Sequence, residues 1–224
     1  MSDLVLFSAP GTCARVPCIA LEEARAEYTL RLVRFMQGEH RSPEFLALNP
    51  KGKVPTLLVG GEPLTENVAI ARYLAARFPR ARLLPKGDDP LAEARITADL
   101  SFCAATLHPI VTRIRMPAFM VDGEEARASV RSKAIAAMQP FARMIDDRLG
   151  DGGWWYGAEW SLVDACLYWV WFRITGAGFP AGDHPAWADH AARMEARPAV
   201  RRALQREAEM EAQLEAEGLA FRPD

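Results

Sequence analysis

Hydrophobic residues in the first third of the chain follow two different periods. Short apolar or alternating runs predict four β-strands, at residues 4–7, 28–35, 53–59 and 62–64. Helix-favouring composition predicts a helix at residues 14–26, and apolar residues at helical spacing predict another at residues 65–78. Ser42 as the cap and Pro43 at the first position predict a short helix at residues 42–50. Gly60-Gly61 separates the last two strands and predicts a hairpin turn. This alternation of strands and helices predicts an α/β domain over residues 1–82.

Beyond residue 90 every pattern is helical. Residues 83–89 are rich in proline and charge and predict a linker. Residues 90–224 then form an all-helical domain, a bundle of roughly five helices. Ser161 and Asp164 have the spacing of a capping box, which assigns them to helix initiation and not to catalysis. The charged run at residues 206–218 predicts a solvent-facing terminal helix.

Composition and charge narrow the classes of function. The 224 residues carry 27 Lys and Arg against 29 Asp and Glu, so the net charge of −2 gives no electrostatic case for binding nucleic acid or an anionic membrane. No apolar run approaches the ~18 residues of a membrane span, and the first residues lack the features of a signal peptide. The four cysteines show no metal-ligand spacing and no C-x-x-C motif. We therefore expect a cytoplasmic protein without a metal.

The predicted helix start at residues 65–67 has the chemistry to bind an amino-acid head group. Thr65 is the expected cap, which places Glu66 and Asn67 in the first turn. Free N–H groups at a helix start attract a carboxylate, and the Glu66 side chain can hold an ammonium. The alternative is an ordinary helix start without a ligand.

Pro55 stands at the start of a predicted strand, where a proline cannot donate to the ladder. If the Val54–Pro55 bond is cis, the Val54 backbone turns outward and can pair with an extended, peptide-like ligand. The alternative is an edge strand that merely begins with proline.

Three segments resemble cytosolic glutathione S-transferases: LVLFSAPGTCARVPCIALEEA from residue 4, GEHRSPEFLALNPKGKVPTLLVGGEPLTENVAIARYLAARFP from residue 38, and SLVDACLYW from residue 161. The combination of N-P-x-G-x-V-P with T-E-x-x-A-I-x-x-Y-L is specific. The resemblance implies a thioredoxin-like N-terminal domain that binds glutathione, an all-α C-terminal domain that contributes the electrophile pocket, and a homodimer. It also implies glutathione as co-substrate, with no cofactor tightly bound.

The same resemblance implies which residues bind most of the glutathione molecule. Val54, before a cis Pro55, would pair its backbone with the cysteinyl part. Glu66 and Asn67 would hold the γ-glutamyl head group. Most relatives have serine where this chain has Asn67, whose amide can still donate to a carboxylate.

For the glycyl carboxylate of glutathione, the segment G-E-H-R-S-P-E-F resembles the plant-type and theta-type pattern. It implies His40 and Lys53 as ligands, with Arg41 as a further possibility. A cation suits this carboxylate well. The alternative for His40 is a solvated loop histidine.

The residue that activates the sulfur is Cys13, Thr12 or Ser8, in that order of preference. The first tyrosine, Tyr28, lies too far along the chain, whereas A-P-G-T-C-A-R-V-P is similar to the S-P-G-A-C-S-x-x-P of beta-class bacterial enzymes. A hydroxyl would donate a hydrogen bond to the sulfur, and the helix start near Cys13 would stabilise a thiolate. Cys13 could instead form a mixed disulfide with glutathione or be inert. Cys18, one turn on, is assigned to the core.

His108, Thr112 and Arg115 fall on one face of a predicted helix. In beta-class enzymes a histidine of this helix lies against the catalytic cysteine, so the resemblance implies an assisting role for His108; a buried histidine satisfied by a neighbour is the alternative.

The predicted function is glutathione transfer to a small, hydrophobic electrophile. The alternatives are a glutathione-dependent thiol–disulfide oxidoreductase or peroxidase that uses Cys13, and a non-catalytic ligand-binding or partner-binding protein of the same fold.

Overall fold

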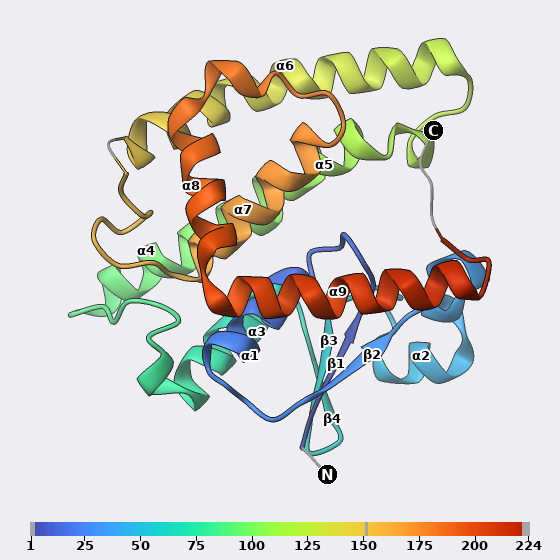
Figure 1. The fold of residues 1–224 in the computed structure, drawn as a ribbon, viewed down its shortest axis with the longest axis horizontal. Helices are drawn as coiled ribbons and strands as arrows, with labels where there is room; N and C mark the ends of the chain where they lie inside the picture. The colour runs from blue at the N-terminus through green and yellow to red at the C-terminus, as the bar shows by residue number, and fades with distance from the viewer. Residues whose placement is uncertain (1–2, 151, 221–224) are drawn as a thin grey trace. The chain divides into compact units, whose positions relative to one another are not determined.

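The computed structural model describes residues 3–150 and 152–220, which pack as two compact units. The first unit is Met1–Leu83 with Arg197–Asp224, and the second is Leu84–Ala196. The strands are all in the first unit: β1 (Leu4–Ser8), β2 (Thr29–Leu32), β3 (Thr56–Val59) and β4 (Glu62–Thr65). The helices of that unit are α1 (Arg15–Glu23), α2 (Pro43–Leu48), α3 (Asn67–Arg77) and α9 (Pro198–Ala216) (Figure 1).

The four strands form one mixed sheet in the order β2-β1-β3-β4. The β1–β2 pair is parallel, which requires a crossover that α1 supplies, whereas β1–β3 and β3–β4 are antiparallel. Phe7 of β1 pairs with Thr56 of β3, and Thr56 pairs with Thr65 of β4. The end of β1, the start of β3 and the end of β4 therefore lie at one end of the sheet, and the segments attached to them meet there.

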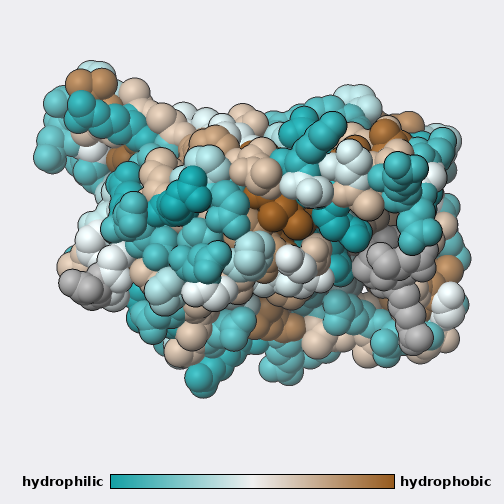
Figure 2. Space-filling model, turned by 90° about the horizontal axis from the view of Figure 1, so that it is seen from above, coloured by the Kyte–Doolittle hydropathy of each residue, from teal (hydrophilic) through white to brown (hydrophobic). Residues whose placement is uncertain are grey.

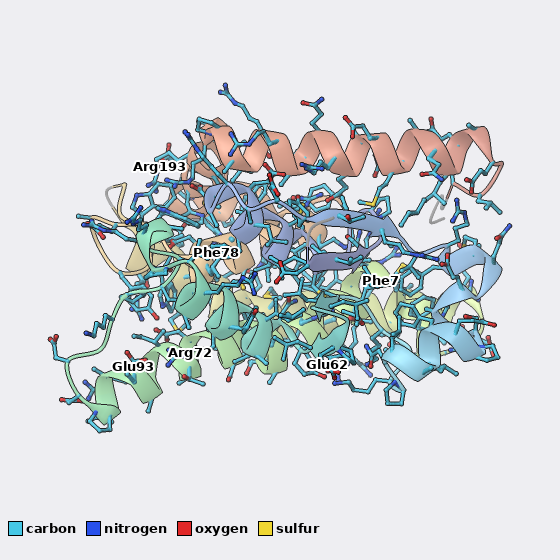
Figure 3. All side chains as sticks on the ribbon, turned by 90° about the horizontal axis from the view of Figure 1, so that it is seen from below. Phe7, Glu62, Arg72, Phe78, Glu93 and Arg193 are labelled. Carbon is cyan, nitrogen blue, oxygen red and sulfur yellow. The ribbon has the colours of Figure 1, made fainter. Side chains whose placement is uncertain are left out.

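Both faces of the sheet are covered, with α2 on one side and α1 and α3 on the other (Figure 1). Alternation along β1 directs Phe7, labelled in Figure 3, to the α2 side. Its ring meets that of Phe45 edge-on, with centroids 5.8 Å apart. Leu4 and Leu6 point to the opposite face and are almost fully buried. The predicted strands and helices of residues 1–82 are thus confirmed. β1 and β4 are each one residue longer than expected, and the other elements are shorter.

One of the two predicted helix caps in this unit is correct. Ser42 caps α2, since its hydroxyl accepts a hydrogen bond from the Phe45 N–H at 3.2 Å. The prediction that Thr65 caps α3 is wrong, because β4 continues through Thr65 to its pair with Thr56. Glu66 is the capping position instead, with a left-handed φ of 73°, and Asn67 is the first helical residue.

The solvent-facing terminal helix predicted at residues 206–218 is also only partly correct. Helix α9 packs along α1 (Figure 1), and Glu207 and Met210 within the charged run are buried. Their burial was not evident from a pattern in which glutamate counts as a surface residue. By packing, residues 197–224 belong with the first unit, although in chain order they end the helical part.

The regular elements in the described part of the second unit are helices, apart from one isolated β-bridge between Trp154 and Gly157. Its helices are α4 (Pro90–Ser101), α5 (His108–Arg115), α6 (Glu124–Leu149), α7 (Leu162–Thr175) and α8 (Pro185–Ala196), with a π-helical segment at Phe102–Leu107. Helix α7 is the core of the unit, buried along almost its whole length. The predicted capping box is present, since Val163 donates its N–H to the Ser161 hydroxyl and the Ser161 N–H donates to the Asp164 carboxylate at 2.7 Å.

The length and apolar character of the helices bear on membrane spanning, and the distribution of hydrophobic residues on the surface bears on partner binding. None of the helices in residues 3–150 and 152–220 combines the length and the apolar character needed to cross a bilayer. On the face drawn in Figure 2, hydrophobic residues form small separate areas among hydrophilic ones, so the described residues there make no continuous apolar surface.

Candidate functional site

Three predicted site residues meet at the end of the sheet where β1 ends and β3 begins. Cys13 lies in the turn between β1 and α1, and its thiol donates to the Val54 carbonyl over a sulfur–oxygen distance of 3.7 Å. The Asn67 side-chain amide, at the start of α3, donates to the Cys13 carbonyl at 3.1 Å. The Val54–Pro55 bond beside them is cis, as the family resemblance implied. Three segments far apart in sequence are thereby joined around one thiol.

Ser8, Thr12 and Cys13 differ in burial and in the partners of their side chains. Thr12 donates its hydroxyl proton to the Ala9 carbonyl at 2.6 Å, so that proton is already engaged within the turn. Ser8 is the last residue of β1, on the same buried face as Leu4 and Leu6, and is itself 3% exposed. Cys13 is 9% exposed and directs its side chain toward Val54.

Cys18 belongs to the core, as predicted. Its thiol lies 3.3 Å from the Tyr28 hydroxyl oxygen, and that hydroxyl donates its one proton to Glu22. Burial raises the pKa of the Cys18 thiol to about 11, so Cys18 is a thiol and not a nucleophile at neutral pH.

The loop before Pro55 is organised by Asn49, which our sequence analysis missed. Asn49 is almost fully buried, and its amide donates to the Lys53 carbonyl at 2.7 Å and to the Thr56 hydroxyl at 3.0 Å. Its side-chain oxygen accepts the Lys51 N–H at 3.1 Å. The signal was present, because Asn before Pro-x-Gly is typical of turns in which the asparagine side chain bonds nearby backbone. Asn49 thus fixes the segment that carries Lys53 and Val54.

His40 is brought beside this loop by a close backbone approach. A Cβ at Gly52 would lie 2.9 Å from the His40 carbonyl oxygen, and Gly52 has a φ of 61°, so a side chain there is doubly disfavoured. The His40 ring stacks on Phe35 with centroids 4.3 Å apart. Burial, with a smaller contribution from Arg41, lowers the pKa of His40, which favours the neutral form of its imidazole. Lys53 is exposed.

Glu66 is exposed and forms an ion pair within the protein. The Lys51 ammonium lies 2.6 Å from a Glu66 carboxylate oxygen and donates to the Thr65 hydroxyl at 2.7 Å. Side-chain exposures of 45% for Lys51 and 67% for Glu66 leave the pair open to water and to a competing ammonium. Lys51 was not among the predicted site residues, because chain spacing does not show that it reaches Glu66.

His108 lies in the second unit, so its predicted role beside Cys13 stays a prediction. Within that unit its ring meets the Trp169 ring edge-on, with centroids 4.7 Å apart. The π-helical segment Phe102–Leu107 ends directly before His108-Pro109. A proline inside a continuous helix cannot donate to the preceding turn, and the wider π turn accommodates this missing donor.

Among the residues that the structure describes, no three His, Cys, Asp or Glu side chains cluster so as to hold a metal ion. The polar groups at the end of the sheet are instead a thiol, an amide, a carboxylate and an ammonium. Such a set suits a ligand with amino, carboxylate and thiol or peptide groups.

Comparison with known proteins identifies matches to both parts of the chain. The family model "Glutathione S-transferase, N-terminal domain" matches residues 2–76, and "Glutathione S-transferase, C-terminal domain" matches residues 124–206. The glutathione S-transferase GstA of Escherichia coli O157:H7 is 33% identical over 168 residues, which cover 74% of this chain and 79% of that protein. The maleylacetoacetate isomerase of Rhizobium meliloti (strain 1021) is 35% identical over 153 residues, 66% of this chain and 70% of that protein.

A solved structure is similar over nearly the whole fold. The glutathione S-transferase of a sphingomonad, in complex with glutathione, superposes with a TM-score of 0.78 at 30% sequence identity. The match covers 91% of this chain and 98% of that one.

Proposed function

The chain belongs to the glutathione S-transferase family, and from this premise we propose that it joins glutathione to a small, hydrophobic electrophile. The observation that carries the proposal is the meeting of Cys13, Val54 and Asn67 at one end of the sheet. In the reaction glutathione loses its thiol proton to solvent, and the thiolate attacks an electrophilic carbon and forms a carbon–sulfur bond. The bond from that carbon to its leaving group breaks, and the leaving group departs with the electron pair, as chloride from 1-chloro-2,4-dinitrobenzene. The protein's contribution is to bind glutathione and to favour its ionised thiol.

The γ-glutamyl head group is assigned to the start of α3. Glu66 holds the ammonium by charge, and Asn67 donates to the carboxylate. Asn67 has two amide protons, of which one is used by the Cys13 carbonyl, so one remains for a ligand. The Val54 backbone pairs with the cysteinyl part, which brings the glutathione sulfur near Cys13.

Lys53 and His40 are assigned to the glycyl carboxylate in different ways. Lys53 supplies the positive charge, whereas His40 supplies a hydrogen bond from its ring. Asn49 and Gly52 support this part of the site by fixing the loop between the two residues.

Cys13 is our first choice for the group that contacts the glutathione sulfur, followed by Thr12 and then Ser8. The Thr12 hydroxyl is held by a short 2.6 Å bond within its own turn, whereas the Cys13 thiol is a weak donor in a 3.7 Å contact with Val54, the residue assigned to the cysteinyl part. This difference, and the buried side of β1 on which Ser8 lies, support the order. We also propose that His108, of the second unit, assists Cys13 at the glutathione sulfur. Residues 90–224 contribute the electrophile pocket. A homodimer and a cytoplasmic location complete the proposal; sedimentation velocity would test the dimer.

A second candidate function is thiol–disulfide exchange at Cys13, favoured by the thiol that this turn places against the Val54 carbonyl. Here the Cys13 thiolate would attack the mixed disulfide of a glutathionylated substrate, release the substrate thiol and then be reduced by a second glutathione. Cys13→Ala separates the candidates. Loss of disulfide reduction with conjugation intact would assign Cys13 to exchange, whereas a fall in conjugation assigns it to the transferase.

Calorimetric titration with glutathione tests the proposal as a whole. We expect saturable binding at millimolar or lower concentrations and catalysed conjugation of 1-chloro-2,4-dinitrobenzene. Absence of binding at millimolar glutathione would favour a ligand-binding or partner-binding protein that retains the fold without turnover.

A further inference from the structure

A buried carboxylate from the far end of the chain holds the turn that carries Cys13. Glu207 of α9 accepts the Gly11 N–H at 2.8 Å through one oxygen, and the same oxygen lies 2.6 Å from Nη2 of Arg15. Its other oxygen accepts Nε of Arg15 at 3.0 Å. The carboxylate therefore binds the turn two residues before Cys13 and two residues after it.

This contact is built into the interior of the first unit. Arg15 is 4% exposed and Glu207 8%, so both charges have left water and depend on each other. Gly11 has a φ of 70°, a left-handed conformation that residues with a side chain rarely adopt. A two-pronged guanidinium–carboxylate pair fixes direction as well as distance.

The turn is also held on its other sides, so that Cys13 has little freedom. Its carbonyl accepts the Val16 N–H at 3.2 Å and the Asn67 amide at 3.1 Å. Its thiol donates to the Val54 carbonyl. Together with Glu207, these contacts anchor the turn to α9, to α3 and to the segment before β3.

We propose that Glu207 and Arg15 are positioning residues, which fix the turn Gly11–Arg15 so that the Cys13 thiol faces Val54. The part of this proposal that concerns catalysis rests on the proposed transferase function. Glu207 and Arg15 act through Cys13 and have no role in contacting the ligand.

The same two helices supply a control contact. Glu22, at the other end of α1, accepts Nε of Arg202 of α9 at 2.8 Å. The Glu22–Arg202 pair thus joins α1 to α9 as the Arg15–Glu207 pair does, but away from the Cys13 turn. Loss of either pair weakens the helix contact, whereas only loss of the Arg15–Glu207 pair should disturb the thiol.

The test compares the double variant Arg15→Met/Glu207→Leu, which leaves no unpaired buried charge, with Arg202→Met. Cys13 alkylation by iodoacetamide is followed by peptide mass spectrometry, alongside thermal unfolding and conjugation kinetics. We expect Cys13 in the double variant to be alkylated at least about fivefold faster, with kcat at least about fivefold lower and KM for glutathione unchanged. Arg202→Met should lower the unfolding midpoint while its alkylation rate and kcat stay as in the native protein.

Equal alkylation rates in the double variant and the native protein would overturn the proposal. So would a Cys13 alkylation rate that rises in proportion to the fall of the unfolding midpoint in both the double variant and Arg202→Met. Glu207→Gln covers the case in which the double variant fails to fold, because an amide oxygen can still accept the Gly11 N–H but no longer pairs with Arg15 as an ion. We expect it to give an intermediate alkylation rate, and a native rate would count against positioning. Alkylation needs no glutathione, so it decides this proposal even if the native protein shows no conjugation.

Discussion

Replacing Lys51 by methionine tests how Glu66 binds the glutathione head group. In the structure the Lys51 ammonium lies 2.6 Å from the Glu66 carboxylate, where our proposal places the ammonium of the ligand. Both cations need the same carboxylate, so Lys51 competes with the ligand. Lys51→Met removes the competitor, and glutathione should bind more tightly.

The size of the effect follows from the exposure of the pair. With side-chain exposures of 45% and 67%, the ion pair is of the solvent-exposed kind, which contributes about 0.2–1 kcal/mol. Release of that interaction lowers the dissociation constant by about 1.4- to 5-fold. In the background of Glu66→Ala, which by itself should weaken binding at least several-fold, Lys51→Met should have no further effect, because the partner of the lysine is already absent.

The assay is isothermal titration of glutathione into the four proteins of this double-mutant cycle, with Lys53→Met as a matched control. Both lysine variants remove one positive charge from the same exposed loop, two residues apart. Glutathione is an anion at pH 7, so a general electrostatic effect would weaken its binding to both. We instead expect opposite signs, with tighter binding for Lys51→Met and weaker binding for Lys53→Met. If Lys51→Met weakens binding as Lys53→Met does, the competition at Glu66 is refuted.

Three other predictions concern single side chains. At pH 8 iodoacetamide should modify Cys13 and leave Cys18 unmodified, because burial raises the pKa of Cys18 to about 11; peptide mass spectrometry measures both. Burial opposes ionisation of Glu22, but hydrogen bonds from neighbouring guanidinium and hydroxyl groups outweigh it and lower its pKa below 4.5. The ionised carboxylate therefore stabilises the fold above pH 4.5, and this stability is lost as the pH falls through the lowered pKa. Urea unfolding at several pH values measures the free energy of unfolding, which should fall less steeply with decreasing pH in Glu22→Gln than in the native protein. An equally steep fall in both proteins would contradict this role of Glu22. Asp164→Ala should lower the free energy of unfolding by at least about 3 kcal/mol, since several buried donors lose their acceptor, against about 1 kcal/mol for Ser161→Ala; equal losses would show that the capping role alone matters.

Local patterns predicted most of the fold because the features concerned are set by neighbouring residues. The strands of residues 1–82, the Ser42 cap and the Ser161–Asp164 capping box each depend on spacings of a few positions. The Thr65 cap failed because its position was decided by a strand partner, Thr56, in another segment. Threonine is a favoured capping residue, but Thr65 instead belongs to β4, where it pairs with Thr56.

The parts that could not be predicted depend on contacts between distant residues. Glu207 is buried because Arg15, 192 positions away, pairs with it, and nothing in the charged sequence of α9 shows this. Lys51 reaches Glu66 only after the β3–β4 hairpin folds back. That the Thr12 hydroxyl bonds the Ala9 carbonyl within its own turn is likewise invisible in the sequence. The segments that carry Cys13, Val54 and Asn67 could therefore be singled out from sequence, whereas the contacts among them required the structure.

A crystal structure with glutathione bound tests the central claim most directly. The account predicts the cysteinyl backbone paired with Val54, the γ-glutamyl ammonium on Glu66 in place of Lys51, and the glutathione sulfur within hydrogen-bond reach of the Cys13 thiol. Glutathione bound elsewhere, or with its sulfur on Thr12 or Ser8 and remote from Cys13, would contradict it.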